Sequence, residues 1–70
     1  MTVARIIGRN LSALRKARGV RQKDVAAAIN MNIGVMNLAE SGQVEPTLTT
    51  LRRLADYYGV TIDSLTINNE

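Results

Sequence analysis

The stretch QKDVAAAINMNIGVMNLAES, residues 22–41, decides the fold of this chain. Its apolar residues recur at the three- and four-residue intervals of amphipathic helices. They form two groups on either side of a polar joint at Asn30, and they are Val25, Ala26, Ile29, Met31, Met36 and Ala39. Because Asn is one of the few residues besides glycine that tolerate a positive φ, the joint is predicted to be a tight turn. The stretch therefore predicts two short helices that cross at a steep angle over a shared core.

Capping residues predict where these two helices begin and end. The first helix begins near Gln22 and stops at Asn30. Asn32 can accept a hydrogen bond from a backbone N–H at the start of the second helix, which is predicted over residues 33–41. Gly42 ends that helix, because glycine readily adopts the left-handed conformation that closes a helix.

Three further helices are predicted around this pair. Before it, Ile7, Leu11 and Leu14 recur at i, i+4 and i+7 in a helix over residues 3–17, which Gly19 ends. After it, Thr47 can cap a fourth helix and Thr61 a short fifth one that ends near residue 65. The fourth helix closes at Gly59, and its predicted core stripe consists of Leu48, Leu51, Leu54 and Ala55. Residues 66–70 are predicted to form a loose tail, so that residues 1–70 make one all-α domain of five helices.

The composition agrees with an all-α domain that is held together by apolar packing. Hydrophobic residues make up 46% of the 70 residues, and the aromatic ones are Tyr57 and Tyr58 alone. Because the chain has no Cys and no His, a disulfide is excluded and neither a metal nor a cofactor is expected. No general base stands beside a nucleophile, so we do not expect an enzyme. The longest uncharged run, residues 25–39, is too polar to cross a membrane, and a cytoplasmic location is expected.

Positive charge is concentrated at the N-terminal end of the chain. The net charge is +3, and no Lys or Arg occurs from residue 24 to residue 51. Seven of the nine basic residues lie in the first 23 positions, namely Arg5, Arg9, Arg15, Lys16, Arg18, Arg21 and Lys23. This charge favours a polyanionic partner that is approached from one side.

Short phrases flank the two-helix stretch at characteristic separations: GVRQ at 19–22, ESG at 40–42, PTLTTL at 46–51 and YGV at 58–60. With these phrases, residues 6–65 resemble the helix-turn-helix family of phage lambda repressor and Cro, the Xre family. The resemblance implies a five-helix, lambda-repressor-like domain of a repressor-like transcriptional regulator. Its third helix would lie in the major groove of double-stranded DNA, and the domain would bind as a homodimer.

The resemblance also implies which residues contact DNA. Gln22 matches a family glutamine at the start of the second helix, which either holds a phosphate or merely helps to cap the helix. Arg21 and Lys23 either add cations beside the DNA backbone or form an ordinary solvated helix end. The implied DNA-binding residues are Arg21, Gln22, Lys23, Asn32, Ile33, Gly34, Asn37, Leu38, Ser41 and Gln43.

Four of these residues occupy the base-reading positions that the resemblance implies for the third helix: Ile33, Gly34, Asn37 and Leu38. The family commonly carries Gln, Arg, Ser or Lys there. Asn37 can read adenine, whereas Ile and Leu can sense only a thymine methyl. The alternative is an exposed apolar patch that binds a protein partner through the third helix, as in an antirepressor or a partner-dependent subunit.

Two further features follow from the resemblance and from the apolar C-terminal end. Arg15 and Glu40 match a family pair that resembles a structural ion pair between the first and third helices. Because four outward positions touch too few bases to find a site alone, a symmetric dimer is expected. Its candidate interface is Tyr57, Tyr58, Ile62, Leu65 and Ile67.

Overall fold

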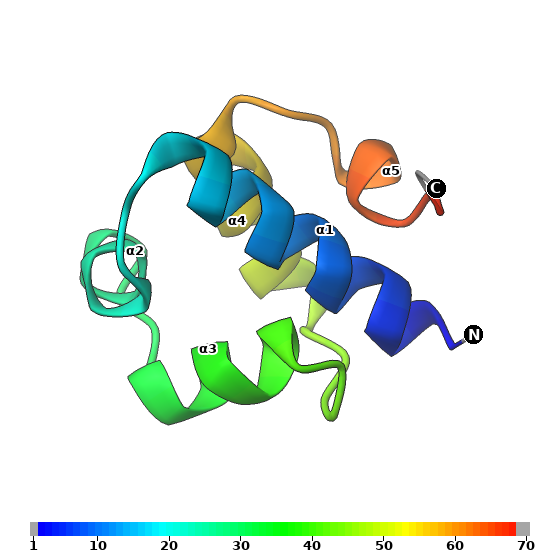
Figure 1. The fold of residues 1–70 in the computed structure, drawn as a ribbon, viewed down its shortest axis with the longest axis horizontal. Helices are drawn as coiled ribbons and strands as arrows, with labels where there is room; N and C mark the ends of the chain where they lie inside the picture. The colour runs from blue at the N-terminus through cyan, green and yellow to red at the C-terminus, as the bar shows by residue number, and fades with distance from the viewer. Residues whose placement is uncertain (1, 69–70) are drawn as a thin grey trace.

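The computed structural model describes residues 2–68, and within that range it contains five α-helices and no strand (Figure 1). The helices are α1 (Val3–Arg18), α2 (Gln22–Ala28), α3 (Ile33–Glu40), α4 (Leu48–Tyr58) and α5 (Ile62–Leu65). The prediction of an all-α, five-helix fold is confirmed. Residues 69 and 70 of the predicted loose tail lie outside the described residues. In the part of the chain that is described, no helix has both the length and the apolar character needed to span a bilayer.

The helix ends agree to within two residues with those predicted from the capping residues. Asn30 has φ of 56°, which turns the chain between α2 and α3 as predicted. Gly19 and Gly59 end α1 and α4 in the left-handed region, with φ of 65° and 69°. The side chains of Thr47 and Thr61 each accept a hydrogen bond from a backbone N–H in the first turn of the helix that they cap. The second helix of the motif ends at Glu40, one residue earlier than predicted.

Every helix contributes to one apolar core. Its buried residues are Ile7, Leu11, Val25, Ala26, Ile29, Met36, Ala39, Leu51, Leu54, Ala55, Tyr58 and Leu65. Leu14, Val20, Met31, Val60 and Ile62 are partly buried against it. Burial of Tyr58 disfavours its charged form and raises the pKa of its hydroxyl to about 12. The core therefore unites α2 and α3 with the other three helices.

Three side chains differ from their predicted environments. Leu48 was expected in the core but is 58% exposed; it is the first residue of α4, and burial of the stripe begins one turn later, at Leu51. Tyr58 and Leu65 were candidates for a dimer interface, yet both side chains fill the core of this chain and are 2% and 1% exposed. They cannot also pack against a second subunit.

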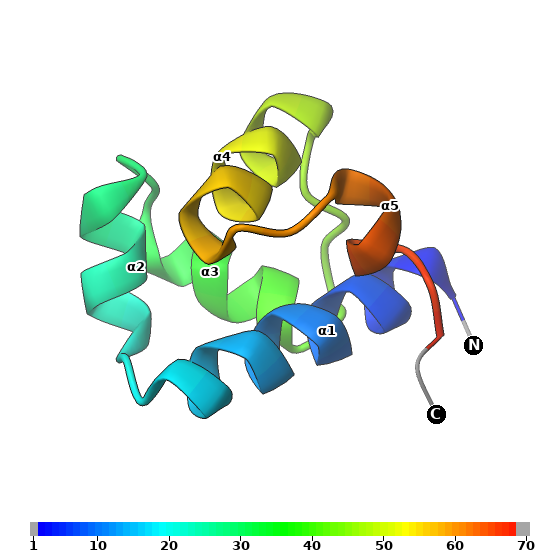
Figure 2. The same cartoon turned by 90° about the horizontal axis from the view of Figure 1, so that it is seen from above.

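The arrangement leaves α3 at one side of the molecule. In Figure 1, α3 runs along one edge of the molecule with α1 and α4 above it, and Figure 2 shows α2 across one end of the molecule. On α1, the side chain of Asn10 donates hydrogen bonds of 2.8 and 2.9 Å from its Nδ2 to the carbonyls of Leu65 and Ile67. The C-terminal segment is thus attached to α1 and leaves the outward side of α3 open.

A glycine sets the distance between α1 and α3. Gly8 is buried on α1, and a Cβ placed on it would lie 2.5 Å from the carbonyl oxygen of Ala39 and 2.7 Å from that of Glu40. Both atoms belong to the backbone and cannot move aside as a flexible side chain would. The last turn of α3 therefore rests directly on the backbone of α1, and this contact fixes how α3 is presented.

Replacing Gly8 with alanine should destabilise the protein, although alanine normally stabilises a helix relative to glycine. Helix propensity alone favours Gly→Ala by about 1 kcal/mol. For Gly8→Ala we expect instead a loss of roughly 1–3 kcal/mol of unfolding free energy, because the methyl group overpacks the contact. The control is Gly34→Ala in α3, whose Cβ would approach a single side-chain atom, Oδ1 of Asn32 at 3.0 Å, and no backbone of another helix. Urea denaturation measures both; a Gly8→Ala protein more stable than wild type would contradict the close contact.

Candidate nucleic-acid interface

One side of α3 faces solvent, and its side chains are mostly apolar. Met36 and Ala39 point into the core and are fully buried. Away from the core, Ile33, Val35 and Leu38 are 50%, 43% and 36% exposed. Gly34 and Asn37 are exposed between them. Four of the implied DNA-binding residues, Ile33, Gly34, Asn37 and Leu38, thus share one accessible helix surface, which we call the outward face of α3.

Polar groups at both ends of α3 are largely engaged within the chain. The Oδ1 atom of Asn32 accepts hydrogen bonds from the backbone N–H groups of Gly34 at 2.7 Å and Val35 at 3.3 Å, and so caps the helix. At the other end, the Ser41 hydroxyl donates to the Leu38 carbonyl at 3.1 Å and accepts from Nε2 of Gln43 at 2.9 Å.

Asn37 differs from these polar residues. Its side chain makes no hydrogen bond to any residue in the range 2–68, so its amide can bind an external group with both its donor and its acceptor. Of the polar side chains implied to contact DNA on α3, Asn37 is therefore the one available in the middle of the helix.

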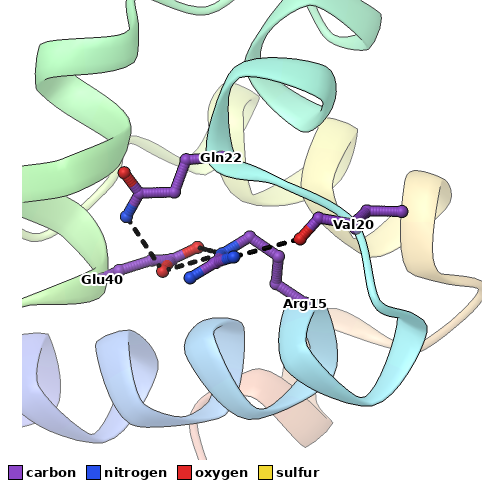
Figure 3. A network of polar contacts seen from close by, with 4 residues as sticks. All are labelled: Arg15, Val20, Gln22 and Glu40. Atoms are coloured by element: carbon purple, nitrogen blue, oxygen red, sulfur yellow. Dashed lines mark hydrogen bonds and ion pairs between the residues drawn. The ribbon is translucent and has the colours of Figure 1, made fainter.

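A polar network joins α1, α2 and α3 on the side of α3 that faces α1 (Figure 3). The guanidinium of Arg15 donates from Nε to both carboxylate oxygens of Glu40, at 2.8 and 3.1 Å, and from Nη1 to the carbonyl of Val20 at 3.0 Å. The two side chains are only 17% and 5% exposed. The hydrogen bond to Glu40 favours the charged form of Arg15 and raises the pKa of its guanidinium.

Gln22 belongs to the same network. Its Nε2 atom donates to Oε1 of Glu40 at 3.1 Å, as Figure 3 shows. The side chain therefore does not cap α2, which was one of the two readings of this residue. Glu40 holds the start of α2 in a defined position against the end of α3 by this bond.

The N-terminus of α2 carries accessible cations. Arg21 precedes α2 at the N-cap position without a side-chain capping bond, and its Nε atom lies 3.2 Å from Oδ2 of Asp24. This hydrogen bond lowers the pKa of the Asp24 carboxyl. Arg21 is nevertheless 71% exposed, and Lys23 is exposed next to it. An exposed pair of this kind is worth little, so Arg21 can exchange its partner for another anion.

The structure adds one cation that was not assigned to the site from the sequence. Arg5 on α1 lies against Gly42, where an added Cβ would be 2.9 Å from Cγ of Arg5 and 3.0 Å from its Cα. Its side chain is exposed and has no ion pair within residues 2–68. Thirty-seven positions separate the two residues along the chain, so no local pattern reveals this contact.

Comparison with known proteins shows which protein family the chain resembles. The model of a helix-turn-helix domain matches residues 6–66. The chain is 40% identical over 55 residues to the HTH-type transcriptional regulator DdrOP3 of Deinococcus deserti, a match that covers 79% of this chain and 43% of that protein. It is 32% identical over 60 residues to the HTH-type transcriptional regulator y4dJ of Sinorhizobium fredii, covering 86% and 78% of the two chains. The chain thus spans less than half the length of DdrOP3.

Solved structures share the fold. The clp gene regulator ClgR from Corynebacterium glutamicum superposes with a TM-score of 0.87 at 20% identity, over 93% of this chain and 69% of its own. The restriction-modification controller protein C.AhdI from Aeromonas hydrophila gives a TM-score of 0.82 at 24% identity, over 89% and 94% of the two chains. These likenesses identify the five-helix arrangement as the lambda-repressor-like fold.

The network around Glu40 should contribute measurably to stability. Glu40→Ala leaves the mostly buried guanidinium of Arg15 without its anion, and we expect a loss of about 2–4 kcal/mol of unfolding free energy, between the values for exposed and buried pairs. Gln22→Ala removes one neutral donor to the Glu40 carboxylate and should cost about 1.5–3 kcal/mol. The test is urea denaturation of these two variants, of the single variant Arg15→Ala and of the double variant Arg15→Ala/Glu40→Ala. Strictly additive losses in the double variant would mean that the two residues do not interact.

Proposed function

This chain belongs to the helix-turn-helix domain family, and from that membership we propose that it is a DNA-binding transcriptional regulator that acts without catalysis. The observation that carries the proposal is the outward face of α3, an accessible helix surface set on a rigid scaffold. A single α-helix fits the major groove of B-form DNA. In the proposed complex α3 lies in that groove and the rest of the domain orients it. A location in the cytoplasm, beside the chromosome, is part of the proposal.

The proposed phosphate contacts lie at two places beside α3. At the start of α2, Arg21, Lys23 and the backbone N–H of Gln22 face one DNA strand. At the end of α3, Arg5 stands next to Gly42 and the segment with Ser41 and Gln43. Residues 41–45 contain no Lys or Arg and include Glu45, so Arg5 supplies the positive charge at this end of α3.

A homodimer is the second part of the proposal. The outward face of α3 offers four side-chain positions to the bases, which is too small a surface for a selective site. Two copies related by a two-fold axis would place two α3 helices about 34 Å apart, one turn of DNA. With Tyr58 and Leu65 excluded by their burial, the remaining interface candidates are Tyr57 and Ile62, which are partly buried, and the exposed Ile67.

Phosphate binding predicts a change in the salt dependence of DNA affinity. Arg21→Ala and Arg5→Ala should each weaken binding to all duplexes alike and reduce the slope of log K against log salt by about one unit, because each removes one phosphate contact. The matched control is Arg53→Ala. Arg53 contacts the carbonyl of Ile29 at the far end of α2 and should leave the slope unchanged. A gel-shift titration with random-sequence duplex at several salt concentrations measures all three; unchanged slopes in both test variants would refute these contacts.

The proposed dimer predicts the stoichiometry of the complex. Sedimentation of the protein at saturation on a palindromic duplex should give two chains per site. Ile67→Asp should weaken cooperative occupation of the two half-sites without unfolding the domain, since Ile67 is 54% exposed. One chain per site at saturation would overturn the dimer.

A further inference from the structure

The outward face of α3 has an unusual chemistry for a surface that meets DNA. Ile33 and Leu38 border it, and between them lie Gly34, which has no side chain, and Asn37, which has the one amide. No cation lies on α3, and none occurs anywhere from residue 24 to residue 51. Hydrogen-bonded readout of guanine, which typically uses Arg or Lys, is therefore absent from this helix.

One feature of the major groove matches such a face. The C5 methyl of thymine is the apolar group that the groove presents, and it belongs to the same base pair as the N6 donor and N7 acceptor of adenine. Aliphatic side chains placed against guanine would instead cover its N7 and O6 acceptors without satisfying them, which is unfavourable. An aliphatic face thus both favours A·T pairs and disfavours G·C pairs.

The order of the side chains around α3 fits this pattern. Ile33 and Asn37 are one helical turn apart, as are Gly34 and Leu38, so an aliphatic residue stands on each side of the amide. At Gly34, an added Cβ would meet only Asn32, which means that the helix backbone itself is accessible there. The backbone can approach the groove closely at that point, while the two aliphatic residues reach bases on either side of it.

We propose that α3 recognises thymine C5 methyl groups through Ile33 and Leu38, with Asn37 on an adjacent adenine, and that the preferred half-site is therefore rich in A·T pairs. This inference rests on the proposed DNA-binding function. It differs from that function in naming the chemical group that is read.

Uracil isolates the methyl group, because it pairs as thymine does and lacks only that group. The probe is the duplex that binds best from a random-sequence pool, prepared once with thymine and once with uracil at its A·T pairs. We expect the thymine form to bind about fourfold more tightly for each contacted methyl, from the transfer free energy of one such group. Ile33→Ala and Leu38→Ala should each lower this ratio, and the double variant should bring it close to one.

The matched control is Leu48→Ala, which makes the same substitution as Leu38→Ala at an exposed leucine of α4, outside both the outward face and the candidate dimer interface. It should keep the thymine-to-uracil ratio of the wild type even if its overall affinity changes. Equal binding of the two forms by the wild-type protein would overturn methyl recognition and leave the proposed DNA binding intact. Absence of binding to any duplex at low salt would overturn both. In that case a change of oligomeric state in Leu38→Arg would identify the outward face as a protein-binding surface.

Discussion

The contact between α1 and the last turn of α3 is the constraint on which the rest of the structure depends. At Gly8 the two helix backbones touch without any side chain between them, and two turns further along α1 the Arg15–Glu40 pair joins the same two helices. A short helix such as α3 would not be stable alone in water. Its orientation is therefore imposed by α1, and the network extends that control to the start of α2 through Gln22.

The two sides of α3 therefore have different roles: one side holds the helix in the fold, and the other is the outward face. The charged groups that hold the helix, Arg15 and Glu40, lie behind it, where they are mostly buried and paired with each other. The outward face is left with aliphatic side chains and a single amide. Because the supporting contacts use none of the outward side chains, this face can vary in chemistry without loss of the fold, which is how one scaffold serves many binding specificities.

In the proposed complex, different groups supply affinity for DNA and specificity for its sequence. In the proposed complex, long-range attraction to DNA comes from cations beside α3, whereas the face of α3 itself is uncharged. Phosphate contacts are strong but insensitive to sequence, and contacts to base edges supply the discrimination. A recognition surface without cations gains little non-specific affinity, so its selectivity is limited mainly by how well its shape and its apolar groups match the base pairs.

The amino-acid sequence by itself determined the local features of this protein. Asn30, Asn32, Gly19 and Thr47 act on residues no more than four positions away, and so the number of helices, their order and nearly all their ends were predictable, together with the outward position of Asn37. Only the tertiary structure decided which apolar residues are covered and which distant residues meet. It exposed Leu48, buried Tyr58 and Leu65, placed Gly8 against the carbonyls of α3 and brought Arg5 to Gly42. The physical reason is that capping depends on neighbours along the chain, whereas burial and close approach depend on how separate helices pack in space.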